Sequence, residues 1–599
     1  MSGITGFCRW DGAYGKNTAH WMAALDGMCG VLAHRGGKRE SRFHMDGAYL
    51  AQTSPCHTGK REVLARLPHE NGAACAVADA ALYHSVGTAS SVEEFLLRLL
   101  LRDGADALEE LNGAFAGAVF VESRRKLYLF RDHMGLKPLF YKLHDGGILF
   151  GSEIKAILRY PGVRAAVTRE GLCEVLGVGP ARRESSGVFD GIFSVLPGHY
   201  AVFDETGFRQ TPYWRLGGAP CADSFEEAAG RVTALVTEAV SRQGGGKICS
   251  FLSGGLDSSI VTALLALERD ARVDTFSFDF TDSGKHFAAN DFQSQRDQPY
   301  AEQMARVLGT RHTYLECDSE QLADALPDAM RARDLPGMAD IDASLLVFSR
   351  QVADAGQYDA ALTGECADEL FNGYPWFHRA ELVAHDGFPW SRDIAVRTAF
   401  LRDDAADALD VPAFAREAYD AACGDVPSFY AESDSDAREK RISYLTIKWV
   451  MATLLDRADR MCASAGLTAR APFADKRIAE YLWSLPWAVK NAHGVKGLLR
   501  TAFTGLLPDE ILYRKKNPYP KTYNPAYERL LASRLQDVLA DANAPIRALA
   551  DAEKVRRFIH TPQDYGKPWY GQLMAGPQML AYWLQMNDWL REYDIQIIT

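Results

Sequence analysis

The stretch with the clearest chemical potential is residues 253–259, Ser-Gly-Gly-Leu-Asp-Ser-Ser. It follows the apolar run 248–252 and precedes the apolar run 260–265, so the order predicts a buried strand, a glycine turn and a helix. Glycines let the backbone approach a ligand, and a helix start offers unpaired N–H groups. The serines add hydroxyl donors, and Asp257 can take a magnesium ion. The stretch therefore predicts a pyrophosphate-binding turn; the alternative is an ordinary serine-capped turn.

A second stretch, residues 362–374, contains three carboxylates within five positions: Glu365, Asp368 and Glu369. At a strand-to-helix turn such a cluster is costly unless it binds a cation or acts on a substrate. Asp368 pairs naturally with Asp257 as a second magnesium ligand on a departing pyrophosphate. A solvated acidic helix start is the alternative.

Both stretches resemble motifs of known enzymes. Residues 253–259 resemble the SGGxDS loop of ATP pyrophosphatases, which adenylate a substrate oxygen, and residues 362–374 resemble the GExxDExFGGY motif of asparagine synthetases. The resemblance implies that Glu365 handles the proton of an incoming amine, and that Tyr374 and Lys496 are also catalytic, with Lys496 holding the α-phosphate. It implies that ATP is held by Leu252, Ser253, Gly254, Gly255, Asp257, Ser258, Ser259, Ser277 and Gly364.

Other segments fit the same family less specifically. Residues 454–460 and 469–475 resemble its LLxRxDR and EARxPFxD patterns, although each alone could be a salt-bridged helix end. Thr468 stands where the family usually has Glu, which puts aspartate as the substrate in doubt. Residues 514–522 form a basic, proline-stiffened loop that either covers the phosphates or is a charged surface loop.

Strands alternate with helices in this half of the chain. A helix is expected over 224–242, a strand over 273–280 that reaches the adenine side, and a helix beginning near 297. Such alternation predicts a parallel sheet with ligands at the carboxyl ends of its strands.

The N-terminal region has a different pattern. The alternating segments 113–120, 126–131 and 147–150 predict an antiparallel sheet. The segments 131–141, 151–156, 196–199 and 213–214 resemble the RDxxGxKPLYY, SExKAL, LPGH and YW sequences of class II glutamine amidotransferases. The resemblance implies the four-layer αββα sandwich of N-terminal-nucleophile hydrolases.

The residues that perform the glutaminase reaction in that family are replaced here. Its nucleophilic cysteine is Ser2, a far weaker nucleophile. The family sequence His-Arg-Gly-Pro-Asp corresponds to residues 34–38 of this chain. The family sequence Asn-Gly-Glu-Ile-Tyr-Asn corresponds to residues 79–84, which begin Asp-Ala-Ala here. Loss of one oxyanion-hole donor alone costs about 2.7–4 kcal/mol of transition-state stabilisation. We expect an inactive glutaminase kept as a scaffold; an engineered replacement of cysteine by Ser2 and a hydrolase using Ser2 are the alternatives.

The length of 599 residues is too great for one hydrophobic core, and we expect two domains, 1–215 and 216–599. The net charge of −12 argues against nucleic acid as the main partner. Neither a membrane span nor a signal peptide is expected, and cysteines without a CxxC pair suit reduced thiols in a cytoplasm. Family resemblance suggests a homodimer.

Together these features predict an ATP- and Mg²⁺-dependent ligase that converts a carboxylate to an acyl-adenylate and joins it to an amine. Because Ser2, Ala80, Ala81 and Thr468 all depart from the family pattern, the chain resembles β-lactam synthetase-type members, which close an intramolecular amide. In β-lactam synthetases the position of Glu365 tends to be Tyr, which favours the asparagine synthetase version of this site. A glutamine- or ammonia-dependent amidotransferase and a non-catalytic scaffold are the alternatives.

Overall fold

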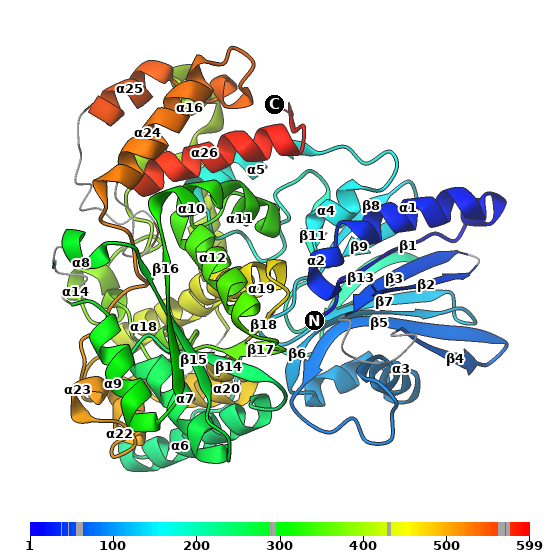
Figure 1. The fold of residues 1–599 in the computed structure, drawn as a ribbon. Helices are drawn as coiled ribbons and strands as arrows, with labels where there is room; N and C mark the ends of the chain where they lie inside the picture. The colour runs from blue at the N-terminus through cyan, green and yellow to red at the C-terminus, as the bar shows by residue number, and fades with distance from the viewer. Residues whose placement is uncertain are drawn as a thin grey trace.

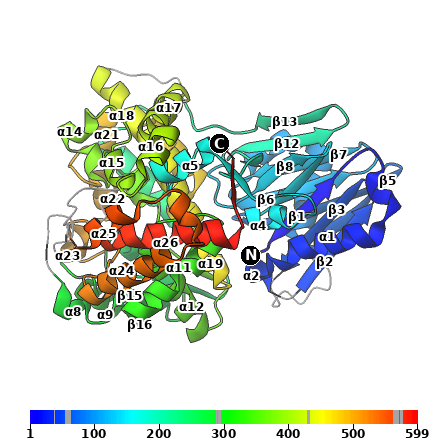
Figure 2. The ribbon, with the colours of Figure 1, turned by 90° about the horizontal axis from the view of Figure 1, so that it is seen from above.

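The computed structural model describes the whole chain except residues 38, 46, 55–63, 288, 290–294, 428–432, 561–569, 571–575 and 599. Two lobes lie side by side (Figures 1 and 2). The N-terminal lobe contains the strands between residues 4 and 212, and the C-terminal lobe contains a second set between residues 248 and 470. No helix in the described ranges combines the length and apolar character needed to cross a bilayer.

Two six-stranded antiparallel sheets form the centre of the N-terminal lobe. In spatial order the first sheet is β11 (Ile192–Ser194), β8 (Phe140–His144), β9 (Gly147–Gly151), β1 (Ile4–Cys8), β3 (Ala48–Ser54) and β2 (Arg39–Met45). The second is β13 (Gly207–Pro212), β12 (His199–Asp204), β7 (Lys126–Arg131), β6 (Gly113–Val121), β5 (Gly72–Leu82) and β4 (Ala65–His69).

Helices cover the outer faces of this pair of sheets. Figure 1 shows α1 (Thr18–Gly30) and α4 (Ile154–Leu158) on one side and α3 (Val92–Asp103) on the other. Apolar residues that alternate along the strands, such as Ile4, Val77 and Phe120, fill the space between the sheets. The predicted αββα sandwich is confirmed, and so are the antiparallel strands.

The C-terminal lobe is built on a five-stranded parallel sheet. Its spatial order is β16 (Arg311–Cys317), β15 (Asp274–Phe280), β14 (Ile248–Phe251), β17 (Ala360–Leu362) and β18 (Thr468–Arg470). The chain runs outward from β14 to β16 and then returns to the other side of β14 with β17. The strand order therefore reverses between β14 and β17, which is where parallel sheets of this kind bind ligands.

Helices pack on both faces of the parallel sheet. Figure 1 shows α6 (Phe225–Gln243) and α7 (Leu256–Glu268) on one face, and α12 (Asp340–Ala355) and α19 (Ala452–Ser464) on the other. The predicted helix over 224–242 is α6, which Ser224 caps through a reciprocal pair of hydrogen bonds with Glu227. The helix expected near 297 is α9 (Gln298–Leu308).

Further helices complete the C-terminal lobe. They include α11 (Leu326–Arg333), α13 (Ala367–Leu370), α17 (Val411–Gly424), α18 (Asp434–Leu445), α22 (Gly497–Ala502), α24 (Pro525–Ala540) and α26 (Gly576–Glu592). The strand β19 (Gln596–Ile598) pairs in parallel with β10 (Ala166–Thr168), so the end of the chain joins the N-terminal lobe. The boundary at residue 215 stays a prediction.

Candidate active site

The two motif turns meet at the point where the strand order reverses. The first follows β14 and the second follows β17, and these strands are hydrogen-bonded neighbours. A Cβ atom on Gly364 would lie 2.7 Å from the backbone nitrogen of Ser258. The turns are therefore in direct contact, and only glycine at position 364 permits that approach.

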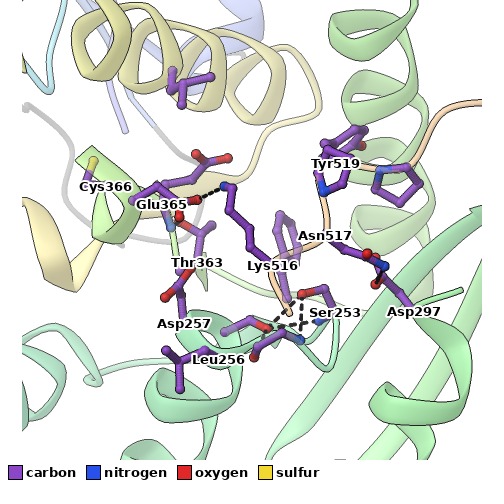
Figure 3. A pocket seen from close by; sticks show the side chains of 18 of the residues that line it. Ser253, Leu256, Asp257, Asp297, Thr363, Glu365, Cys366, Lys516, Asn517 and Tyr519 are labelled. Carbon is purple, nitrogen blue, oxygen red and sulfur yellow. Dashed lines mark hydrogen bonds and ion pairs between the residues drawn. The ribbon is translucent and has the colours of Figure 1, made fainter. Parts of the chain in front are cut away.

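Both turns line one cavity of about 310 Å³. Figure 3 shows Asp257, Thr363 and Glu365 on one side of it, and Asn517 and Tyr519 on the other, with Lys516 between them. The sequence predicted that these turns share a site, and the structure brings them together. Leu252, Ser253, Gly255, Ser258, Ser277, Gly364, Asp368, Tyr374 and Lys496 also line this cavity.

The serines of the first turn have different positions. The Oγ of Ser253 lies 3.0 Å from the Oγ of Ser258 and accepts a 3.2 Å hydrogen bond from the N–H of Gly255, so this pair fixes the turn. The prediction that Ser259 supplies a hydroxyl to the site is wrong for this structure. Ser259 is fully buried in the first turn of α7 and does not line the cavity.

Gly254 likewise lies behind the cavity wall. Its φ is +70°, and a Cβ atom would lie 2.4 Å from the backbone nitrogen of Ala301. Its carbonyl oxygen accepts a 3.0 Å hydrogen bond from Nη1 of Arg514. Gly254 therefore shapes the turn, and it is not positioned as a ligand contact.

A lysine joins the two aspartates predicted as magnesium ligands. The Nζ of Lys496 lies 2.5 Å from Oδ2 of Asp257 and 2.6 Å from Oδ1 of Asp368. Lys516 makes a second ion pair with Asp368. Burial acts to raise the pKa of Asp368, but the two lysines outweigh it and hold this pKa well below its usual range.

The pKa values of Asp257 and Lys496, the other two groups of this cluster, are both raised. Burial raises the pKa of Asp257, and the nearby Asp368 adds to the shift against the effect of Lys496. Burial acts to lower the pKa of Lys496, but the two aspartates together raise it. Lys496 therefore remains a cation at the centre of the site.

Glu365 lies beside Arg457, which α19 contributes. The Nη1 of Arg457 is 3.5 Å from Oε1 of Glu365, and its guanidinium packs over the ring of Tyr519 at 4.6 Å. Burial raises the pKa of Glu365, and Arg457 opposes this shift. Residue patterns alone did not place residues 454–460 in the site, although this motif contains an arginine between two acids, Asp456 and Asp459.

Tyr374 does not present a free hydroxyl. Its OH donates a 2.6 Å hydrogen bond to Oε1 of Glu369, a carboxylate that is only 1% exposed. Burial raises the pKa of Glu369 to about 7, and the neighbouring Asp368 adds to this shift. Sequence reasoning noted Glu369 among three acids but assigned it no role; here it holds Tyr374.

The side of the cavity near β15 is aromatic. Ser277 Oγ lies 2.7 Å from Nε2 of His312. Phe348 of α12 packs against Phe251 at 4.6 Å and against Phe278 at 5.5 Å, measured between ring centroids. This wall suits the flat, apolar faces of a purine base.

The basic loop, residues 514–522, covers the site and is not a free surface loop. Arg514 Nη2 lies 2.6 Å from Oδ1 of Asp297, and Asn517 Nδ2 lies 3.0 Å from the same atom. Lys516 extends into the cavity (Figure 3) and makes an ion pair with Asp368. Of the two readings of this loop, the structure supports the one in which it covers the phosphate region.

Thr468 lies away from the cavity. It begins β18, level with Ala360 at the start of β17, whereas the cavity lies at the carboxyl ends of these strands. Thr468 is not among the residues that line the cavity. The structure therefore gives Thr468 no contact with the cavity, and the doubt about aspartate stays a prediction.

The region of Ser2 contains a buried ionic cluster. The backbone N–H of Ser2 donates a 2.9 Å hydrogen bond to Oδ1 of Asp79. Asp79 also pairs with Arg35 at 3.1 Å and with Lys137 at 3.5 Å. Lys137 and Arg35 lower the pKa of Asp79 to about 2, although burial alone would raise it. Lys38, the last residue of the motif 34–38, lies outside the described residues.

This cluster crosses between the lobes. Asp459 on α19 lies 2.6 Å from Nη2 of Arg35 and 2.8 Å from Nζ of Lys137. On the same helix Arg460 lies 3.4 Å from Glu153. The segment 454–460 is thus in the middle of a buried helix rather than at a salt-bridged helix end.

Comparisons with known proteins agree with this arrangement. The family model described as asparagine synthase matches residues 231–591, and the one described as glutamine amidotransferase domain matches residues 80–214. The chain is 39% identical to asparagine synthetase [glutamine-hydrolyzing] 3 of Bacillus subtilis, over 85% of this chain and 83% of that protein. This chain belongs to the asparagine synthase family. It is an AMP-forming carbon–nitrogen ligase that depends on ATP.

Two more distant relatives show the range of the family. Asparagine synthetase [glutamine-hydrolyzing] of Gallus gallus is 25% identical over 71% of this chain and 66% of its own length. Amidase chyE of Penicillium rubens is 28% identical over 51% of this chain and 46% of its own length. The resemblance to β-lactam synthetases has no counterpart among these relatives.

Proposed function

We propose that this enzyme adenylates a substrate carboxylate and joins it to an amine that does not come from glutamine. Intramolecular closure of an amide, in specialised metabolism, is the form of the reaction we favour. The observation that carries the proposal is the cluster of Asp257, Asp368 and Lys496 where the two motif turns meet.

Adenylation would take place between the two turns. The phosphates would lie against the Ser253 turn and the first turn of α7, with Arg514 and Lys516 on the loop that covers them. Lys496 would face the α-phosphate and stabilise the negative charge that develops as the carboxylate oxygen attacks. Pyrophosphate would leave, and the acyl-adenylate would remain beside Glu365.

Asp257 and Asp368 fit a magnesium ion. Mg²⁺ usually binds through one or two carboxylates together with substrate phosphates, and Oδ1 of Asp257 is buried without a hydrogen-bond partner in the described structure. Among the described residues no group of three His, Cys, Asp or Glu side chains could hold a metal. Phosphate oxygens and water would supply the remaining ligands. When bound, Mg²⁺ would neutralise charge on the departing pyrophosphate.

In the second step the amine would attack the carbonyl carbon of the acyl-adenylate, AMP would leave, and Glu365 would take the proton that the amine loses. Burial raises the pKa of this carboxylate, which favours a group able to take a proton from the attacking amine. Tyr374, whose hydroxyl donates to Glu369, would orient the acyl group rather than exchange a proton. Holding both reactants in one cavity supplies much of the acceleration.

The N-terminal lobe supports a source of nitrogen other than glutamine. The carboxylate of Asp79 is occupied by Arg35, Lys137 and the backbone of Ser2, in a region where a glutaminase must admit glutamine. Ser2 is only 8% exposed. These contacts support an N-terminal lobe that has lost glutamine hydrolysis.

A second function is a glutamine- or ammonia-dependent amidation of aspartate or a related acid. The observation in its favour is the 39% identity to a glutamine-hydrolysing synthetase. Glu365, rather than Tyr, at the start of the second motif fits this reading too. The natural codon at position 2 would show whether Ser2 has replaced a cysteine.

One assay separates these functions. AMP and pyrophosphate release is measured with carboxylic acids that carry an amine, with and without glutamine and ammonia. We expect amide formation that needs neither nitrogen source. Glutamine hydrolysis coupled to amide formation would refute the proposal in favour of the second function.

A further inference from the structure

The cavity has two separate aromatic walls, although one nucleotide needs only one. The first, described above, is formed by Phe251, Phe278 and Phe348 beside β15. The second is formed by Trp376 and Trp390, with Val450 and Leu454 from the helical segments η6 (Thr446–Met451) and α19. Trp376 lies 5.6 Å from Trp390 between ring centroids and stacks on Tyr374 at 4.2 Å.

The second wall lies on the side of the reacting groups. Trp376 follows the second motif turn directly, two residues after Tyr374, and the turn itself carries Glu365 and Asp368. The first wall, which suits an adenine base, is formed by residues of β14, β15 and α12. It lies on the other side of the Ser253 turn. An acid whose carboxyl group reaches Lys496 would therefore place the rest of its body against the second wall.

Two polar groups at this wall are hydrogen-bonded within the protein. Nε1 of Trp376 donates a 3.1 Å hydrogen bond to Oγ1 of Thr446, and the hydroxyl of Tyr374 donates to Glu369. Two cations lie nearby: Nζ of Lys516 is 4.5 Å from the centroid of the Tyr374 ring and pairs with Asp368, and Arg457 lies 3.5 Å from Glu365 and 3.6 Å from Asp342. Carboxylates therefore balance both charges, and Trp376, Val450 and Leu454 offer a substrate ring faces and methyl groups.

From this arrangement, and resting on the proposed function, we propose that the enzyme selects a carboxylic acid with an aromatic or bulky apolar body. Trp376 and Leu454 are the residues that determine this specificity. A small polar acid such as aspartate would leave the wall without contact, and it would gain nothing from the apolar surface there.

The test is a binding measurement by calorimetry on the full-length enzyme, with Mg²⁺ and a non-hydrolysable ATP analogue. The probes are 3-phenylpropionate and L-aspartate. We expect 3-phenylpropionate to bind at least about tenfold more tightly. If L-aspartate binds as tightly as 3-phenylpropionate, or more tightly, the inference is overturned.

Two matched variants locate the effect. Leu454→Ala should lower the affinity for 3-phenylpropionate about three- to tenfold. It should change the affinity for the ATP analogue less than twofold. Phe348→Leu, on the first wall, should weaken binding of the ATP analogue and change the affinity for 3-phenylpropionate less than twofold. Leu454→Ala is preferred to a change at Trp376 because Leu454 is half-buried and Trp376 is 3% exposed. An unchanged affinity for 3-phenylpropionate in Leu454→Ala would overturn the assignment.

Pyrophosphate exchange separates this inference from the function on which it rests. Exchange with aspartate but not with aromatic acids would leave the ligase function intact and refute the inference. Absence of exchange with every acid tested would refute the proposed function itself. Exchange with aromatic acids that falls in Leu454→Ala supports both.

Discussion

Arg35 and Asp459 are 424 positions apart in sequence, and their side chains lie 2.6 Å apart in a buried pair between the lobes. Asp459 is two residues from Arg457, the arginine that contacts Glu365. The N-terminal lobe is therefore joined through α19 to the candidate active site. A lobe that no longer hydrolyses glutamine would still support the helix that forms part of that site.

Asp459→Asn should strongly destabilise the enzyme. The change removes one of the two carboxylates that Arg35 and Lys137 share and leaves them only Asp79 in common. Breaking one partner of a buried ion pair costs about 3–5 kcal/mol. Urea unfolding measures the effect. The control is Asp403→Asn, because Asp403 is 90% exposed and pairs with Lys554 at the surface. Such surface pairs contribute about 0–1 kcal/mol. Equal effects of the two variants would contradict a supporting role for the inter-lobe cluster.

Ser2→Ala should leave amide formation within about twofold of the wild type. The Oγ of Ser2 is only a weak acceptor, 3.4 Å from Nε2 of Gln52, and the proposed reaction does not use it. Initial rates of AMP release with and without glutamine measure the effect. A loss of glutamine-dependent activity in this variant would show that Ser2 is a nucleophile.

Lys496→Met should lower the rate of pyrophosphate exchange by about 10²–10³-fold. Loss of one preorganised group that stabilises developing charge has an effect of this size. Lys247→Met, at an exposed lysine, is the control and should change the rate less than twofold. Wild-type exchange in Lys496→Met would remove Lys496 from the reaction.

Glu365→Gln should separate the two half-reactions. Glutamine cannot take a proton from the amine, so amide formation should fall about 10²–10⁴-fold. Pyrophosphate exchange, which precedes the amine step, should stay within about fivefold. Parallel assays of exchange and of amide product check this expectation, with the exposed Glu268→Gln as control. A parallel loss of both activities would place Glu365 in adenylation instead.

The buried Lys490 should make stability depend on pH. Burial lowers the pKa of Lys490 to about 7, and nearby Lys440 adds to the shift. The unfolded chain then binds more protons than the folded one between pH 7 and 10.5, the ordinary pKa of a lysine. Stability should therefore rise with pH across this window, by up to about 1.4 kcal/mol per pH unit. Thermal unfolding between pH 7 and 10 measures the rise, and Lys490→Met should reduce it.

The sequence by itself determined the elements of the active site. Glycines at 254, 255 and 364 next to serines and acids favour tight turns at strand ends, and alternating strands and helices indicate a parallel sheet. These features can be predicted from sequence because turn geometry and ligand type depend on neighbouring residues.

Only the tertiary structure decided which of these side chains act together. Ser259 is buried in the first turn of α7, Thr468 lies at the end of its strand away from the cavity, and Tyr374 is held by Glu369. Lys516 and Arg457 enter the site from segments far along the chain. Their roles could not be read from residue spacing, because long-range packing sets which way each side chain points and which charges it meets.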